Sequence, residues 1–166
     1  MKYFGLILIF VSCSGAGIIK SFEYTKSQNE IYAFILMLRF IKREVSFFLT
    51  RQKDIFLRFE NKTLEKTGIL KDLREKEIED EKSPLYHVLR AYENKLSINE
   101  DAKDILFEFS ESFGRMSVSE QLEKCSHTIS ELEEIYKKGK EQSAEAIKTC
   151  RMLGCIVGVA VVLLLI

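Results

Sequence analysis

Two uncharged apolar runs near the ends of the chain constrain its fold more than any other feature. The first run covers residues 3–19 and the second covers residues 152–166. Every Asp, Glu, Arg and His, and every Lys except Lys2, lies between them. Charge-free apolar runs are typical of membrane-spanning helices, whereas a helix on a soluble domain normally keeps one polar face. The layout predicts a helical domain, residues 20–151, held to a membrane at both ends.

Both runs are short for membrane spans. A helix over residues 3–19 reaches about 25 Å at its usual rise per residue, against about 30 Å for the hydrocarbon core of a bilayer. The run over residues 152–166 is shorter still, but Lys148 and Arg151 precede it and can extend to the interface. We therefore predict an N-terminal transmembrane helix at residues 3–19 and a C-terminal one at residues 152–166.

The basic residues next to the runs predict the orientation of these spans. All but one lie on the side of the middle domain, and only Lys2 lies on the other side. They are Lys20, Lys26, Lys137, Lys138, Lys140, Lys148 and Arg151. Because cytoplasmic flanks of membrane helices carry the excess of Lys and Arg, the middle domain is predicted to be cytoplasmic and both termini to lie outside.

The start of the chain also admits a second interpretation. Lys2, an apolar stretch and then Phe10-Val11-Ser12-Cys13-Ser14 are similar to a lipoprotein signal, in which Cys13 would be acylated. The apolar run continues past Cys13 to Ile19, whereas a mature lipoprotein usually begins with a polar tether. The alternative to a membrane-spanning protein is thus a surface lipoprotein or a membrane adaptor.

Apolar residues in the middle domain recur at helical spacing and predict an all-α fold, a helical bundle of five to six helices. The chain has one Pro and eight Gly, which favours long helices with short connections. The stripe of the first long helix is expected to face the core. It consists of Ile31, Ile35, Leu38, Ile41, Val45 and Phe48, broadened by Phe34 and Phe47.

Capping and turn residues divide the next part of the chain. Helices are predicted over residues 52–66, ended by Gly68, and over residues 69–81, which are highly charged and expected to be solvated. Ser83-Pro84 begins a fourth helix, and Asn99 caps a fifth, which Gly114 ends. The inward-facing residues are expected to be Ile55, Phe56, Phe59, Leu64, Leu70, Leu73, Ile78, Leu85, Val88, Leu89, Tyr92, Leu96, Ile105, Leu106, Phe109 and Phe113.

The last long helix begins at a predicted capping box, Ser117 to Glu120, and continues into the second apolar run. Its apolar seam alternates three and four residues apart, as in a coiled coil. The seam consists of Leu122, Cys125, Ile129, Leu132, Tyr136 and Gly139, prolonged by Ser143, Ile147 and Cys150. The favoured interpretation packs this seam on the first long helix within one subunit, and the alternative pairs it between subunits.

The sequence shows no pattern of a catalytic, cofactor-binding or metal site. There is no glycine-rich phosphate loop, Ser/His/Asp grouping or Cys-x-x-Cys pair, and Cys125 and His127 point to different faces of a helix. We therefore predict that the protein is not an enzyme and has no small-molecule substrate. Net charge is zero, and the basic residues are not interleaved with aromatic ones, so nucleic-acid binding is not expected.

One charged segment stands out. From Lys71 to Lys82, acidic and basic residues alternate. We expect this segment to be a solvated helix face crossed by salt bridges. The alternative is a charged docking surface for a protein partner.

Several short stretches occur in a characteristic order along the chain. Near the start they are Lys2, Gly5, Gly15 to Gly17, and Leu38-Arg39-Phe40-Ile41-Lys42-Arg43-Glu44-Val45-Ser46. Near the end they are Phe113-Gly114, Gln121, Leu132, Arg151-Met152-Leu153-Gly154 and Gly158. Together they resemble the stage III sporulation protein AB family of endospore-forming bacteria. The chain departs from that pattern at Thr50-Arg51 and at residues 116–119, which affects loops and not the bundle.

The resemblance implies a process that the residue pattern alone does not. It implies a component of the channel that joins mother cell and forespore, located in the mother-cell membrane around the forespore. The middle domain would resemble the cytoplasmic helical domains of the platform protein in type II secretion and type IV pilus systems. The partners so implied are the cytoplasmic sporulation ATPase, stage III sporulation protein AA, and other channel subunits. The family offers no catalytic residues.

Overall fold

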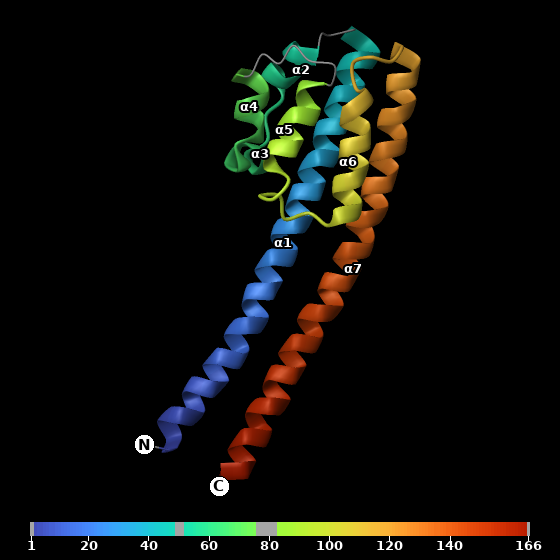
Figure 1. The fold of residues 1–166 in the computed structure, drawn as a ribbon. Coiled ribbons are helices and arrows are strands. Elements are labelled where there is room, and N and C mark those ends of the chain that lie inside the picture. Colours follow the sequence, from blue (N-terminus) through green and yellow to red (C-terminus); the bar gives the residue numbers. More distant parts are fainter. Residues whose placement is uncertain (1, 49–51, 76–82, 166) are drawn as a thin grey trace. The chain divides into compact units, whose positions relative to one another are not determined.

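The computed structural model is helical throughout the elements it describes (Figure 1). It describes the backbone of residues 2–48, 52–75 and 83–165, and side chains of residues 24–47, 54–75, 83–142 and 152. No strand occurs in those backbone ranges. The helices are α1 Lys2–Phe48, α2 Gln52–Arg58, α3 Lys62–Thr67, α4 Ile69–Glu75, α5 Pro84–Tyr92, α6 Glu100–Ser112 and α7 Val118–Leu165. The all-α fold class is thus confirmed.

The chain divides into two compact units. One unit is Ser27–Lys137, and the other combines Met1–Lys26 with Lys138–Ile166. Helices α1 and α7 each contribute residues to both units. The hydrophobic core of the described side chains lies wholly within the Ser27–Lys137 unit. This unit falls inside the predicted middle domain, residues 20–151.

Among the residues that the structure describes, no helix combines the length and the apolar character that crossing a membrane requires. The predicted spans, residues 3–19 and 152–166, lie outside the residues whose side chains are described, with the exception of Met152. The two predicted spans remain predictions.

Helix α1 supplies the centre of the core, as its stripe predicts. Five residues of the stripe are at most 1% exposed, namely Ile31, Phe34, Ile35, Leu38 and Ile41. Val45 is 6% exposed. The expectation for Phe47 is wrong, because its side chain is 77% exposed. At 3.6 residues per turn, a position two residues after Val45 lies on the opposite side of the helix. Phe48 lies outside the described side chains.

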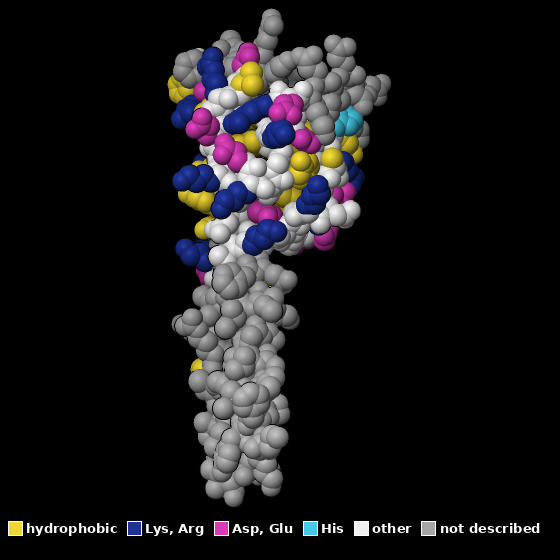
Figure 2. Space-filling model, turned by 90° about the vertical axis from the view of Figure 1, so that its left-hand side faces the viewer, with side chains coloured by type: hydrophobic (Ala, Val, Ile, Leu, Met, Phe, Trp, Pro, Cys, Tyr) yellow, Lys and Arg dark blue, Asp and Glu magenta, His cyan; other side chains and the backbone are white. Residues whose placement is uncertain are grey.

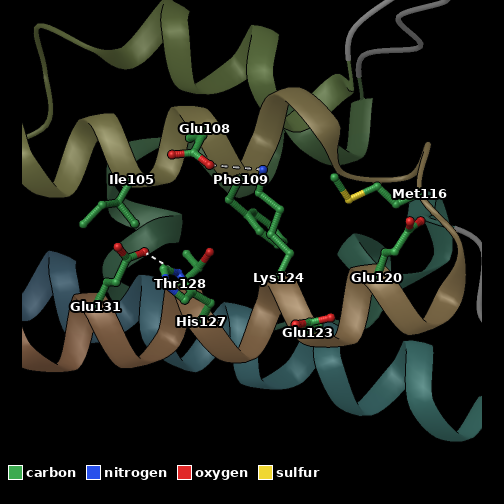
Figure 3. A pocket seen from close by; sticks show the side chains of 10 residues that line it. All are labelled: Ile105, Glu108, Phe109, Met116, Glu120, Glu123, Lys124, His127, Thr128 and Glu131. Atoms are coloured by element: carbon green, nitrogen blue, oxygen red, sulfur yellow. Dashed lines mark ion pairs between the residues drawn. The ribbon is translucent and has the colours of Figure 1, made fainter.

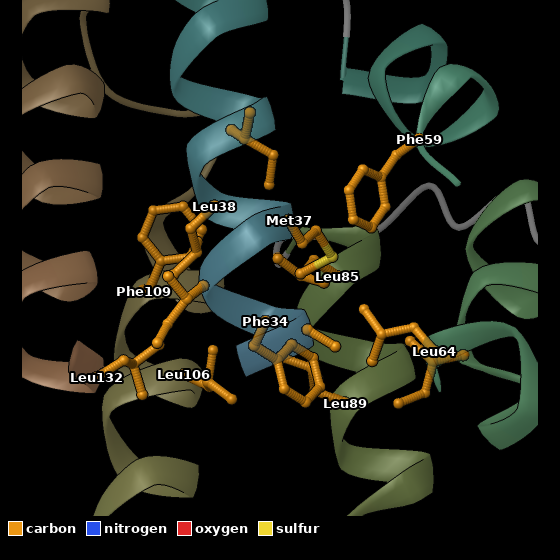
Figure 4. Packing of buried hydrophobic residues seen from close by; sticks show 14 of the residues in the cluster. Phe34, Met37, Leu38, Phe59, Leu64, Leu85, Leu89, Leu106, Phe109 and Leu132 are labelled. Atoms are coloured by element: carbon orange, nitrogen blue, oxygen red, sulfur yellow. The ribbon is translucent and has the colours of Figure 1, made fainter. Parts of the chain in front are cut away.

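Within the Ser27–Lys137 unit, the seam of α7 packs against α1, as the favoured interpretation predicts, whereas the predicted seam residues Ser143, Ile147 and Cys150 lie outside the described side chains. Cys125, Ile129 and Leu132 belong to the same buried cluster as the α1 stripe, and Figure 4 shows Leu132 and Leu38 directed into this core. Contacts between described side chains also join the two helices directly. The Tyr32 and Tyr136 rings are 5.5 Å apart, and an Arg39 guanidinium nitrogen lies 2.6 Å from a Glu133 carboxylate oxygen.

The predicted single helix over residues 52–66 is wrong, because the chain leaves the helix after Arg58. Asn61 begins α3 as an N-cap: its side-chain oxygen accepts hydrogen bonds from the backbone N–H groups of Thr63 (3.0 Å) and Leu64 (3.2 Å). Satisfying these otherwise unpaired donors favours a new helix start over continuation. The predicted apolar residues of this segment are nevertheless buried. They are Ile55, Phe56, Phe59 and Leu64.

Gly68 ends α3, as predicted. Its φ of 88° lies in the left-handed region, and its N–H donates to the carbonyl of Glu65 at 3.0 Å. A Cβ at this position would lie 2.8 Å from the Tyr92 hydroxyl oxygen, so both conformation and space favour glycine.

Helix α4 is more firmly docked than the solvated outer helix that its charges predict, although Leu70 and Leu73 face inward as expected. Ile69, Leu70 and Leu73 are each at most 3% exposed. Three apolar residues within two turns therefore dock α4 on the core despite its charged composition. The predicted extension of this helix to residue 81, with Ile78, lies outside the described residues.

The starts of α5 and α6 lie where the sequence predicts, but their caps act through the backbone. Ser83 precedes Pro84 at the first turn of α5, and Asn99 precedes α6; neither side chain forms a capping hydrogen bond. The Asn99 carbonyl instead accepts from the Lys103 N–H at 3.1 Å. After α6 the chain turns at Gly114, whose φ is 87°.

The predicted apolar faces of α5 and α6 are largely buried. Tyr92 and Ile105 are only half-buried, and Leu96 lies beyond the end of α5 although it is buried. The fully buried residues are Leu85, Val88, Leu89, Leu106, Phe109 and Phe113.

Candidate protein-binding surface

The charged segment that the sequence singled out is only partly a solvated face. Lys71 and Glu75 are exposed, but Arg74 turns back toward α2. Its guanidinium donates to the backbone carbonyls of Phe56 (3.2 Å) and Phe59 (2.6 Å). It also lies 3.8 Å from a carboxylate oxygen of Glu65. Arg74 therefore stabilises the end of α2 instead of being available to a partner, and residues 76–82 lie outside the described ones.

Charges of both signs are mixed over part of the surface. On the face drawn in Figure 2, the described Lys and Arg side chains are interspersed with Asp and Glu. Such a face produces little long-range field of one sign, because neighbouring opposite charges cancel within a short distance. This face gives a charged partner no preferred place to bind.

The described side chains include no group of three or more His, Cys, Asp and Glu residues placed to hold a metal ion. Cys125 and His127 do point to different faces, as their spacing predicts. The Cys125 side chain is fully buried, and this burial raises the pKa of its thiol to about 12. The His127 side chain is 74% exposed, and its Nδ1 lies 3.0 Å from a Glu131 carboxylate oxygen.

A groove with a volume of about 360 Å³ lies between α6 and the start of α7 (Figure 3). Its apolar part comes from Ile105 and Phe109 of α6 and from Met116 in the connection between the helices. Phe109 is buried, whereas Ile105 and Met116 are half-buried and leave apolar surface facing the groove. We call this the α6–α7 groove.

The rim of the α6–α7 groove is acidic. Glu108 contributes from α6, and three more carboxylates come from α7, namely Glu120, Glu123 and Glu131. Lys124 lies between the two helices with its ammonium 3.3 Å from Glu108. With His counted as neutral, the four carboxylates and one lysine give the groove a formal charge of −3. Thr128 also lines the groove but is almost fully buried.

Glu120 is held in place by the predicted capping box, which the structure confirms. The Ser117 N–H and hydroxyl donate to Glu120 Oε2 at 2.9 and 2.7 Å, and the Glu120 N–H donates to the Ser117 hydroxyl at 3.4 Å. These hydrogen bonds, first that of the Ser117 hydroxyl and then that of its N–H, lower the pKa of Glu120. Its carboxylate is therefore ionised at neutral pH.

Glu123 differs from the other acidic residues of the rim. It is exposed, and among the described residues it has no ion pair or side-chain hydrogen bond. A carboxylate in this situation is available to a cation from outside the chain.

Sequence reasoning missed this groove, although one signal was present. Glu120, Glu123, His127 and Glu131 follow one another at intervals of three and four, which places them along one flank of α7 beside its apolar seam. That this flank meets Ile105 and Phe109 of α6 depends on tertiary packing, which no spacing within α7 reveals.

The sequence of this helical bundle is similar to that of one protein family. Residues 2–166 match the family described as stage III sporulation protein AB. No curated protein matches the chain, and no solved structure does either. The match covers nearly the whole chain and agrees with the resemblance carried by the short stretches near both ends. The chain therefore belongs to the stage III sporulation protein AB family.

Proposed function

We propose that this protein is a membrane-anchored scaffold of the sporulation channel between mother cell and forespore, and that it docks the cytoplasmic ATPase, stage III sporulation protein AA. Membership of the stage III sporulation protein AB family over residues 2–166 carries this proposal, because it supports a role in sporulation. In this proposal the protein acts by binding, in the manner of the platform protein of type II secretion and type IV pilus systems.

Two features of the chain support a scaffold role. The Ser27–Lys137 unit has one buried hydrophobic cluster, and each described helix from α1 to α7 contributes residues to it. Because such a core is closely packed, the unit offers a rigid surface for partners. The two apolar runs, residues 3–19 and 152–166, provide anchors, and the basic residues beside them favour a cytoplasmic middle domain. The proposed location is the mother-cell membrane around the forespore.

The proposed topology predicts which positions a membrane-impermeant thiol reagent reaches. In a chain with its four native cysteines replaced, a cysteine added after Ile166 should react in intact cells. One introduced at the exposed Glu60 should react only after lysis. Reaction at position 60 but not after Ile166 would reverse the topology. An N-terminus beginning at Cys13, found by mass spectrometry, would replace the first span by a lipoprotein anchor.

Deletion of the gene should block spore formation and leave vegetative growth unchanged, because the proposed channel operates only once engulfment has begun. Heat-resistant spores should fall by several orders of magnitude, and microscopy should show arrest at the engulfed or engulfing stage. Complementation with the full chain should restore sporulation, whereas a chain lacking residues 152–166 should not. Normal sporulation of the deletion strain would overturn the assignment to the channel.

A further inference from the structure

We propose that the α6–α7 groove is the docking site for a basic segment of the partner ATPase, with Lys or Arg side chains on the rim and an apolar side chain between them. This inference rests on the proposed function, since it names the surface through which the scaffold would hold its partner. It places that surface on α6 and α7 and not on the charged segment at residues 71–82.

The acidic rim of the groove favours a positively charged partner segment. The rim carries a formal excess of three negative charges. Two of its carboxylates, those of Glu120 and Glu123, matter most for binding a cation. Glu120 is ionised because the capping box lowers its pKa, and Glu123 lacks a partner among the described residues. A basic segment that approaches this rim gains attraction to Glu123 without breaking an internal ion pair. Rim charges mainly steer association and make binding sensitive to salt.

The apolar lining of the groove favours an apolar side chain in the bound segment. Ile105 and Met116 are half-buried and line the groove on either side of the buried Phe109 (Figure 3). Methionine is flexible and adapts to side chains of different shape. A volume of about 360 Å³ is at the small end of ligand pockets, so it suits one or two side chains of a partner more than a whole ligand. A partner segment with an apolar residue flanked by Lys or Arg therefore fits both the apolar lining and the acidic rim of the groove.

The groove is a better candidate than residues 71–75 for a physical reason. Arg74 is already bonded to two backbone carbonyls of the segment after α2, so a partner would have to compete with the fold for it. By contrast, Glu123 is exposed, and the ion pair of Glu131 is with the exposed His127. Changes on the rim therefore alter charge with little effect on packing.

The test measures binding of the full chain, in detergent, to the purified ATPase by light scattering and titration. The double variant Glu123→Lys/Glu131→Lys should bind roughly 10- to 100-fold more weakly, and the neutral variant Glu123→Gln/Glu131→Gln should lie between it and the wild type. Glu60→Lys changes an exposed carboxylate on the connection between α2 and α3 and should bind like the wild type. Higher ionic strength should weaken wild-type binding more than binding of the double variant.

Each outcome decides one question. If the wild type does not bind the ATPase, the proposed docking role and this inference fail together. If the wild type binds and both rim variants bind equally well, with unchanged helical content and melting temperature, only the groove assignment fails. If the rim variants abolish self-association of the chain instead of ATPase binding, the groove receives a second copy, which also overturns the inference.

Discussion

Replacing Phe109 by Ala should lower the free energy of unfolding by about 3–5 kcal/mol, the range for truncating a buried Phe. Phe109 is 2% exposed, and its ring stacks on Phe113 with centroids 5.2 Å apart and planes 26° apart. The truncation removes this contact and leaves a void beneath the α6–α7 groove, because close-packed neighbours relax only in part. Urea unfolding of the full chain in detergent, followed by circular dichroism, measures the change.

Phe47→Ala is the matched control for Phe109→Ala. It removes the same ring from a side chain that is 77% exposed, so its effect should stay within about 0.5 kcal/mol. Equal losses for the two variants would contradict the assignment of Phe109 to the core and of Phe47 to the surface. The comparison isolates burial from residue type, which a single variant does not.

Replacing Arg74 by Ala should lower the free energy of unfolding by about 2 kcal/mol. The guanidinium donates two charge-assisted hydrogen bonds, to the carbonyls of Phe56 and Phe59, and such bonds contribute about 1.5–3 kcal/mol each when buried. The side chain is 29% exposed, so water replaces part of each bond and reduces the loss. The same urea titration measures the loss.

Lys71→Ala tests whether the effect of Arg74→Ala belongs to its contacts and not to the charge of the segment. Lys71 is exposed on the same helix, and its loss should have little effect on stability. If both variants destabilise the chain equally, the inward role of Arg74 is wrong. If the prediction holds, replacing Arg74 weakens the fold itself and is a poor test of docking, whereas changes at Glu123 and Glu131 leave these backbone contacts intact.

Much of the bundle follows from periodicity. The α1 stripe apart from Phe47, the α7 seam at Cys125, Ile129 and Leu132, the glycine turns at Gly68 and Gly114 and the capping box at Ser117 are where their patterns predict. These features depend on residues close together in the chain. The choice of face depends on helical spacing, and the ends depend on glycine's access to positive φ or on a nearby hydrogen-bond acceptor. Local rules are therefore sufficient for them.

The differences between prediction and structure at α2 to α4 have other physical causes. A continuous helix over residues 52–66 satisfies the apolar spacing, but Asn61 caps a new helix, and Arg74, far along the chain, binds the carbonyls released at the break. Helix α4 carries many charges, yet its residues Ile69, Leu70 and Leu73 are buried in the core. The Asn61 cap is local, acting on Thr63 and Leu64, whereas the contacts of Arg74 and the burial of α4 depend on surfaces that other helices supply.

The sequence by itself determined the helical class, the faces of the long helices and the family to which the chain belongs. It did so because helical periodicity and the order of short stretches are properties of the linear chain. Only the tertiary structure decided that Arg74 serves the fold and that Glu108 of α6 shares a groove with Glu120, Glu123 and Glu131 of α7. A groove is formed by side chains from two helices, so its depth and net charge depend on how those helices pack, which no spacing within either one specifies.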